Sequence, residues 1–403
     1  MAATLWWPSS ARLAARFVHY GCDVSAVCPR GHVLRHVSGI GHAYRYRSLD
    51  SLTALEAAID AAKPDFVIPC DDRVVWQLHE LHGRRPHLRP LIENSLGPAT
   101  EYGIVVRRER VLKTAQSLAI RIPETQHVDS EQDVRAWFAG GAARSVLKLD
   151  GTWGGIGVHI VDSERDAIVA LRKLARRTSL GTTVKRLLVN RDPLSAWTWW
   201  RREESTMTIQ KFIPGRPANS MLACWRGETL ASVTVEVLSA QGATGAGIVV
   251  RVVENHEISR AVRLLAERLQ LTGFYGFDFV IEAATKSAHF IEMNPRCTQL
   301  GHLSLPNQGD LAGVLYAQLA RRGNPKPQSP IENDVVAFFP QAVLANPHSQ
   351  FARRAHLDIP WDDPALVREL LLPPWPDRKW MGRVYHYFRP PRVVATVDFE
   401  TRS

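Results

Sequence analysis

The sequence has no hydrophobic run that could cross a bilayer. A membrane-spanning helix needs about 18 to 20 consecutive apolar residues, and no stretch of this 403-residue chain approaches that length. Residues 2–17 are mildly apolar, but they lack the continuous apolar core and small-residue cleavage site of a secretory signal. We therefore expect a cytoplasmic protein with no membrane partner.

Cysteine is scarce and shows neither a metal-binding nor a disulfide pattern. The five cysteines are Cys22, Cys28, Cys70, Cys224 and Cys297. They form no CxxC pair, and their spacing fits no metal motif. An odd, dispersed set favours reduced thiols, as in a cytoplasmic compartment.

Two common nucleotide-binding motifs are also missing. The turn after the first expected strand reads Trp-Pro-Ser-Ser rather than GxGxxG, and no GxxxxGK(S/T) loop is present. These absences argue against dinucleotide binding and against a P-loop protein. The formal charge of +10, from 50 Lys and Arg against 40 Asp and Glu, fits an anionic ligand such as a nucleotide. Because no basic stripe is interleaved with aromatic residues, the charge pattern disfavours a nucleic-acid partner.

Alternating strands and helices fill the first hundred residues. Short apolar runs predict strands at 3–7, 23–28 and 66–69, and amphipathic patterns predict helices from Ser9-Ser10 to about Tyr20 and at 51–62 and 73–81. Asp71-Asp72 can cap the last of these helices. Strands separated by helices imply a parallel sheet, here a small Rossmann-like domain.

The later part of the chain changes in composition twice. Residues 181–206 are rich in arginine and tryptophan and read as an insertion that packs on the body or covers a site. After about residue 325 the proline density rises, which indicates a C-terminal appendage. Between these segments the patterns predict strands at 145–149, 158–161, 207–213 and 232–237, and helices at 109–118, 134–138, 166–177 and 258–269.

The sharpest pattern is a β-hairpin predicted over residues 277–294 by two alternating runs around a short polar turn. With its centre near residue 285, Asp278 lies opposite Glu292, and both point to one face with Asn294. Two carboxylates and an amide oxygen on one face indicate a hard cation such as Mg²⁺, which is bound by ligands of this kind. The alternative is a half-exposed hairpin whose polar face meets water.

Two weaker patterns contain a lysine and a glutamine. Lys148 lies on a predicted strand beside a loop with four glycines, and glycines let backbone amides approach phosphate oxygens closely. Gln210 begins the segment Gln-Lys-Phe-Ile-Pro-Gly, a strand whose edge groups can read an adenine ring. A tight hairpin with a surface lysine and a plain strand with a turn are the alternatives. Arg251 can anchor a substrate carboxylate or be an exposed strand arginine.

Taken together, and in their order along the chain, the three patterns resemble the ATP-grasp superfamily over about residues 107–320. The resemblance implies an α/β and α+β architecture, in which a Rossmann-like N-terminal domain precedes a two-subdomain ATP-grasp fold and a C-terminal appendage. The implied limits are 1–106, 107–325 with an insertion at about 181–206, and 326–403.

The resemblance also implies the roles of individual residues. The phosphates would be bound by Lys148, Gly154, Gly155 and Gly157, and the adenine by Gln210, Lys211, Phe212 and Ile213. The metal ligands would be Asp278, Glu292 and Asn294. Arg108 stands at the place of the family's first lysine. Arg296 is similar to the arginine that contacts the substrate or acyl-phosphate, so Arg296 and Lys148 are the expected catalytic residues.

By this resemblance the protein is a ligase that uses ATP and one or two Mg²⁺ ions, which Mn²⁺ can replace. It would activate a small-molecule carboxylate as an acyl-phosphate and transfer it to an amine, with release of ADP and phosphate. Bicarbonate, ammonia or a thiol are alternative nucleophiles. A nucleotide-binding protein without ligase activity is the other alternative, because Lys211 replaces the usual glutamate of the hinge strand. A homodimer is compatible with the family.

Overall fold

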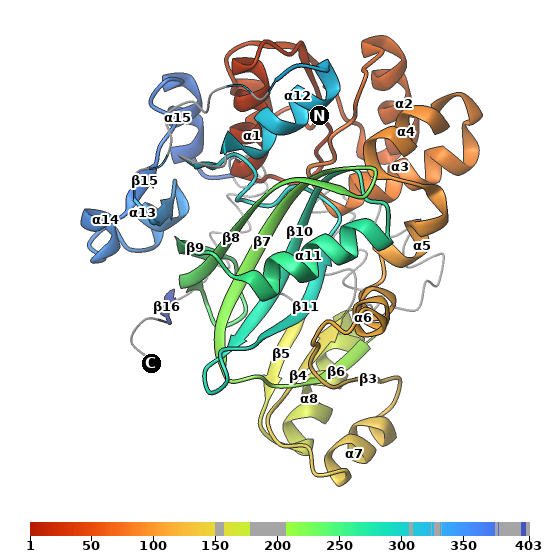
Figure 1. Ribbon diagram of the computed structural model, residues 1–403, viewed down its shortest axis with the longest axis vertical. Coiled ribbons are helices and arrows are strands. Elements are labelled where there is room, and N and C mark those ends of the chain that lie inside the picture. Colours follow the sequence, from red (N-terminus) through yellow and green to blue (C-terminus); the bar gives the residue numbers. More distant parts are fainter. Residues whose placement is uncertain are drawn as a thin grey trace.

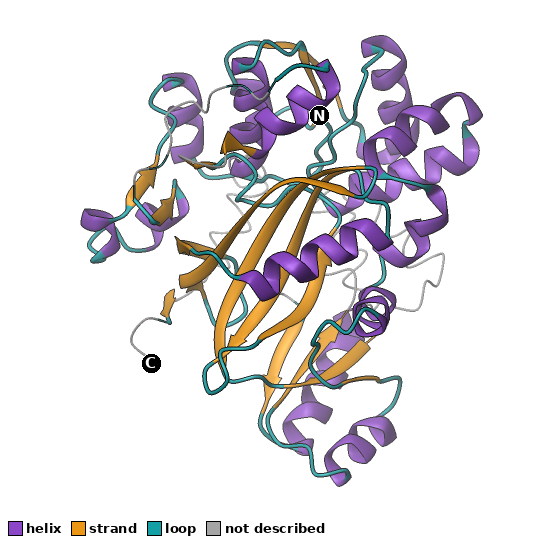
Figure 2. Ribbon diagram, viewed as in Figure 1, coloured by secondary structure: helices purple, strands orange, loops and turns teal. Residues whose placement is uncertain are grey.

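The structure is a computed structural model, and it describes residues 1–149, 157–177, 207–305, 309–323, 325, 331, 333–374, 378 and 396–399. Its strands form an eight-stranded sheet, a four-stranded sheet and two small two-stranded ladders. The N-terminal helices lie at one end of the large sheet, and the four-stranded sheet lies toward the other end (Figures 1 and 2). No helix of the described ranges is long and apolar enough to span a membrane.

The N-terminal region is a small α/β unit with parallel strands, as predicted. β1 (Val24–Cys28) runs parallel to β2 (Ile40–Arg45), and single parallel bridges join Ala2 to residues of β1 and to Pro69. The helices of this region are α1 (Pro8–His19), α2 (Ser51–Ala62), α3 (Asp72–Arg84), α4 (Arg89–Leu96) and α5 (Tyr102–Val105). Short 3₁₀ helices connect them at Val33–His36, Ser48–Asp50, Pro86–Leu88 and Ala99–Glu101.

Two local expectations for this region are wrong. The strand expected at 3–7 does not form, since the bridging residue is Ala2, and the strand expected at 66–69 is reduced to a single bridge at Pro69. The first helix begins at Pro8, and Trp7 rather than a serine stands at its N-cap position, without a side-chain capping hydrogen bond. Proline suits the first helical position because its missing N–H would have no partner there and its φ is already helical.

The four-stranded sheet has the order β3-β6-β4-β5, with antiparallel neighbours throughout. Its strands are β3 (Thr125–His127), β4 (Ser145–Leu149), β5 (Val158–Val161) and β6 (Met207–Lys211). One face is covered by α7 (Glu131–Ala139) and α8 (Glu164–Arg177), where Leu147 and Ile209 are buried in a common apolar cluster. The side chains on the opposite face of β4 and β6 are therefore available to a site.

The eight-stranded sheet has the order β11-β10-β7-β8-β9-β14-β15, and β16 pairs with β8. The strands are β7 (Gly215–Trp225), β8 (Glu228–Gln241), β9 (Gly247–Val252), β10 (Gly273–Glu282), β11 (Ala288–Asn294), β14 (Val335–Phe338), β15 (His356–Asp358) and β16 (Thr396–Asp398). α11 (His256–Arg268) lies across one face (Figure 1), and it belongs to the apolar cluster that buries Phe277, Phe279 and Phe290. α12 (Leu311–Ala320) packs with α1 on the other side of the sheet.

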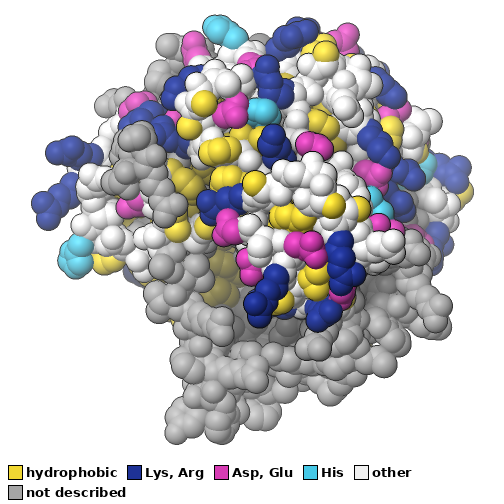
Figure 3. Space-filling view, turned by 90° about the horizontal axis from the view of Figure 1, so that it is seen from below, with side chains coloured by type: hydrophobic (Ala, Val, Ile, Leu, Met, Phe, Trp, Pro, Cys, Tyr) yellow, Lys and Arg dark blue, Asp and Glu magenta, His cyan; other side chains and the backbone are white. Residues whose placement is uncertain are grey.

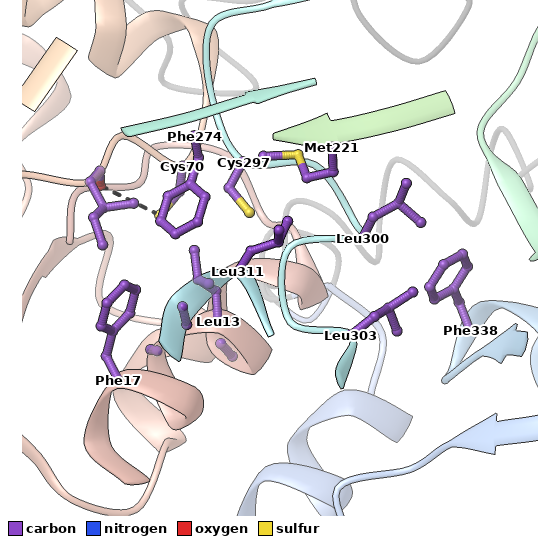
Figure 4. Close-up of a cluster of buried hydrophobic side chains, with 14 of the residues drawn as sticks. Leu13, Phe17, Cys70, Met221, Phe274, Cys297, Leu300, Leu303, Leu311 and Phe338 are labelled. Carbon is purple, nitrogen blue, oxygen red and sulfur yellow. Dashed lines mark hydrogen bonds between the residues drawn. The ribbon is translucent and has the colours of Figure 1, made fainter. Parts of the chain in front are cut away.

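A continuous core joins the N-terminal, central and C-terminal regions (Figure 4). Leu13 and Phe17 of α1 meet Met221 and Leu311 there, and the same cluster includes Phe338 of β14. The described C-terminal residues thus complete the large sheet and add α13 (Gln341–Ala345), α14 (Phe351–Arg354) and α15 (Pro364–Leu371). Because the core does not break at residues 106 and 325, the domain limits there stay a prediction.

Charged side chains of both signs are mixed on the face drawn in Figure 3. Among the described residues of that face, lysines and arginines alternate with acidic and apolar side chains instead of forming one broad basic surface.

Candidate active site

The hairpin of β10 and β11 brings the two predicted acids together. The antiparallel ladder sets Asp278 directly opposite Glu292, and a β-bulge follows, so that Phe279 pairs with Phe290. The bulge leaves Ile291 without a partner in the ladder and breaks the strict alternation of the strand. Phe290 therefore points into the core under α11, while the two acids share the opposite face.

Asp278 is held between two side-chain amides. The Nδ2 atom of Asn219, directly opposite on β7, donates to Oδ1 of Asp278 at 2.6 Å, and Nδ2 of Asn294 donates to Oδ2 at 3.1 Å. Burial and the charge of Glu292 raise the pKa of Asp278 to about 6, although both amides act in the other direction. A second acid beside a buried acid creates a site that a cation would stabilise.

Glu292 faces basic side chains instead. Arg108, the first residue of α6 (Arg108–Ser117), donates from Nη2 to Oε1 of Glu292 at 3.0 Å. Burial acts to raise the pKa of Glu292, but the charges of Arg108, Lys148 and Arg296 outweigh it, and the pKa is lowered. Glu292 therefore ionises more readily than Asp278.

Arg296 is tied to the N-terminal region. Its Nε donates to Oδ2 of Asp72 at 3.0 Å, and its Nη2 lies 3.5 Å from Oδ1 of Asn294. Asp72 begins α3, whose N-cap is Asp71, as the sequence indicated. Arg296 therefore contacts both the predicted metal site and the N-terminal unit.

Lys148 and Gln210 share one face of the small sheet. β4 and β6 pair Lys148 with Thr208 and Val146 with Gln210, so these side chains point away from α7 and α8. Lys148, Thr208 and Gln210 are all buried, and Nε2 of Gln210 donates to Oγ1 of Thr125 at 3.0 Å. The register thus places the expected phosphate-binding lysine and the expected hinge glutamine on the same face, as diagonal neighbours.

The predicted hinge strand ends earlier than expected, at Lys211. The Lys211 side chain is exposed, and its N–H donates to the carbonyl of Glu124 at 2.9 Å. Phe212 and Ile213 follow as half-buried residues, and the guanidinium carbon of Arg144 lies 4.4 Å from the centre of the Phe212 ring.

The fold is similar to solved structures over most of its length. N5-carboxyaminoimidazole synthetase from Staphylococcus aureus, complexed with ADP, has a TM-score of 0.57 at 14% identity, over 81% of this chain and 78% of that one. Biotin carboxylase from Campylobacter jejuni, in a β-γ-ATP complex, has 0.57 at 14% identity, over 79% and 70%. L-amino acid ligase from Bacillus licheniformis has 0.54 at 12% identity, over 79% and 73%. At these identities the likeness shows the shared fold.

A model of the ATP-grasp domain family matches residues 194–299, which contain β6, the hairpin and both acids. These residues therefore match an ATP-grasp domain, and the fold shared with the solved structures extends over most of the chain. No curated protein matches its sequence. The predicted architecture, with an α/β N-terminal unit in front of an ATP-grasp fold, is confirmed.

Part of the predicted ATP-grasp site lies outside the described residues. Gly154 and Gly155 are there, as is the whole of the tryptophan-rich segment 181–206. Gly157 is described and buried, and its carbonyl accepts from the N–H of Leu149 at 2.9 Å. Its part in phosphate binding stays a prediction.

Three residues enter the site without having been predicted. Asn219 and Thr208 are polar residues within largely apolar strands. Once the strand register is known, this places Asn219 opposite Asp278 and Thr208 opposite Lys148. Thr208 is fully buried, and its Oγ1 has no hydrogen-bond partner among the described residues. Asp72 gave no signal beyond helix capping, because its contact with Arg296 spans 224 residues of sequence.

Arg251 lies away from the acids. Arg251 of β9 lies opposite Glu236 of β8, Glu236 lies opposite Ala218 of β7, and Ala218 lies opposite Phe279 of β10. Arg251 therefore shares the face that is turned toward α11, opposite to the face of Asp278. Its guanidinium lies 3.6 Å from the carboxylate of Asp334.

Proposed function

We propose that the protein is an ATP- and Mg²⁺-dependent ligase that activates a small-molecule carboxylate as an acyl-phosphate and transfers it to an amine. An oxygen of the carboxylate attacks the γ-phosphorus of ATP, the bond to the β,γ-bridging oxygen breaks, and ADP leaves. The amine then attacks the acyl carbon and loses a proton as phosphate leaves. The observation that carries this proposal is the acid pair Asp278 and Glu292, in register on one hairpin and faced by Arg108 and Lys148.

The side chains of the hairpin fit Mg²⁺. Asp278 and Glu292 offer carboxylate oxygens, and the amide of Asn294 can present its oxygen after a rotation, since amide oxygen and nitrogen are assigned from their contacts. The pKa of Asp278 is raised first by burial and then by the negative charge of Glu292. Mg²⁺ held there would neutralise charge on the phosphates.

The basic residues have separate roles in this proposal. Lys148, on one face of the four-stranded sheet, would bind the phosphates. The strand of Gln210, on the same face, would contact the adenine. Arg296, at the far end of the acid pair, would bind the substrate carboxylate or the acyl-phosphate, because a guanidinium matches such groups in a bidentate way. Rate acceleration then comes mainly from positioning and charge neutralisation. The nucleotide complexes of the synthetase from Staphylococcus aureus and of biotin carboxylase support a nucleotide in this fold.

The similar proteins differ in the nucleophile that their names imply. One is an L-amino acid ligase, which supports an amine. Two others are a biotin carboxylase and an N5-carboxyaminoimidazole synthetase, which makes bicarbonate chemistry the alternative.

The test measures ADP release with ATP, Mg²⁺ and pooled amino acids and carboxylates, with and without bicarbonate, and identifies the product by mass. We expect release that requires both an acid and an amine, with a product equal to their sum less one water. Lys148→Ala and Glu292→Ala should each reduce release at least about 100-fold. Lys113→Ala, at an exposed position of α6, and Glu282→Ala at the hairpin end should not. Wild-type release in both site variants would contradict the assigned roles. Nucleotide binding without ADP release in any pool would instead favour a binding protein.

A further inference from the structure

The ion pair between Asp72 and Arg296 joins the N-terminal unit to the metal-site hairpin. Arg296 is almost buried, with 13% of its side chain exposed, whereas Asp72 is 42% exposed. The carboxylate engages Nε, so it fixes the direction in which the rest of the guanidinium points. Arg296 has one ionic partner within reach in the described structure, and that partner comes from α3.

Asp72 is held in place by the residue before it. The carboxylate of Asp71 accepts from the backbone N–H groups of Thr4, Leu5 and Val74 and from the Thr4 hydroxyl. Asp71 is fully buried. Because these contacts tie the start of α3 to the chain after residue 3, the backbone of Asp72 has little freedom to follow Arg296 if the guanidinium moves.

The acid pair competes with Asp72 for the guanidinium. Arg296 reaches Asn294, which in turn donates to Asp278, so the cation lies one side chain away from the first acid. Neither Asp278 nor Glu292 forms an ion pair with Arg296 in the described structure, although the charge of Arg296 acts on both. Without Asp72, the carboxylates whose charge still acts on Arg296 are Asp71 and Asp278. The oxygens of Asp71 are already engaged by backbone N–H groups, so a released guanidinium would turn toward Asp278.

We infer that Asp72 is a positioning residue: it holds Arg296 off Asp278 and Glu292 and so keeps the acid pair open to a divalent cation. The inference rests on the proposed function, in which these acids hold Mg²⁺. It also assigns a role to the N-terminal unit, since a residue of α3 controls a charge inside the ATP-grasp site.

The experiment measures Mn²⁺ binding in the presence of ADP by the loss of the free-ion electron paramagnetic resonance signal. Asp72→Ala should weaken Mn²⁺ binding at least tenfold, because Arg296 then competes for the acids. Asp72→Asn, which removes only the charge, should weaken it in the same direction. Arg296→Ala should bind Mn²⁺ at least as well as the wild type. The double variant Asp72→Ala/Arg296→Ala should match Arg296→Ala, because the effect of Asp72 passes through Arg296.

The control is Glu101→Ala, which removes a different contact between the N-terminal unit and the ATP-grasp fold, that of Glu101 with Arg268 at 3.4 Å. It should bind Mn²⁺ like the wild type. Binding by Asp72→Ala equal to wild type overturns the inference, as does a loss that persists in the double variant, since a purely structural role of Asp72 would not need Arg296. If Glu292→Ala leaves wild-type Mn²⁺ binding intact, the proposed function fails as well, and that result separates the two failures.

Discussion

Asp358 joins three parts of the chain, and replacing it with asparagine tests that connection. It ends β15 and is 5% exposed. Nη2 of Arg12, on α1, donates to Oδ1 of Asp358 at 2.5 Å, and Nε2 of His302 lies 2.6 Å from Oδ2. His302 belongs to the loop after Arg296, so the carboxylate ties the C-terminal strand and the first helix to the site loop.

The expected loss of stability from Asp358→Asn is about 3 kcal/mol near neutral pH. Removing one partner of a buried ion pair costs about 3 to 5 kcal/mol, because the other charge stays buried without compensation. Here that charge is Arg12, whose side chain is 10% exposed. Asparagine is isosteric, and its oxygen can still accept from Arg12, which places the loss at the lower end of that range.

The loss should depend on pH in a defined direction. Burial acts to raise the pKa of Asp358, but Arg12 and His302 outweigh it and hold the pKa well below its usual value. The folded state then binds fewer protons than the unfolded chain at acid pH. Its stabilisation is fully present above the unfolded pKa of about 3.9 and is lost as the pH falls below it. The deficit of the variant should therefore shrink on acidification.

Urea unfolding of wild type and variant at about pH 7 and about pH 3.5 measures both quantities. Asp334→Asn is the control: Asp334 is 64% exposed and pairs with Arg251 of β9, so its loss should change stability by less than about 1 kcal/mol. A deficit below about 1 kcal/mol at neutral pH, or one that is equal at both pH values, would refute this reasoning.

Two further changes test the packing around the acid pair. Gly276→Ala would place a Cβ 2.4 Å from Cγ2 of Thr298, a short branched side chain, and should lower the free energy of unfolding in urea by about 1 to 3 kcal/mol. A loss below about 0.5 kcal/mol would mean that the loop after Arg296 yields easily. Asn219→Ala removes a donor to Asp278 and should lower thermal stability by about 1 kcal/mol, with Asn219→Asp more harmful because it adds a third acid. Equal effects of the two substitutions would contradict the charge argument.

The sequence predicted the hairpin well because local alternation and turn position are properties of adjacent residues. It placed Asp278 opposite Glu292, as observed, but the prediction assumed one register for the whole hairpin, and the structure has two registers separated by a bulge. From Phe279 to the turn, the pairing is shifted by one residue from the predicted register. The bulge at Ile291 absorbs this shift, so that the predicted register holds at Asp278 and Glu292. Alternation alone does not reveal a bulge, because a bulge is selected by the packing of Phe290 under α11.

Contacts between distant segments could not be predicted in this way. The partner of Arg296 comes from α3, and the partners of Asp358 come from α1 and the site loop. A polar residue at the start of a helix reads as a cap whatever else it does, so Asp72 was indistinguishable from Asp71. The C-terminal strands were expected as an appendage, and their pairing with β8 and β9 depends on a sheet edge formed much earlier in the chain.

The charge distribution around the acid pair explains why the N-terminal unit matters to the ATP-grasp site. Three cations act on Glu292, whereas Asp278 accepts from two neutral amides and is acted on by one cation, Arg296. Asp72 engages this guanidinium, whose Nη2 lies 3.5 Å from Oδ1 of Asn294. In the proposed site a divalent cation would lie beside this guanidinium, and an anion outside the ligand set would hold the guanidinium away from the acids. Because α3 supplies that anion, the ATP-grasp fold alone would carry an acid pair that its own arginine could close.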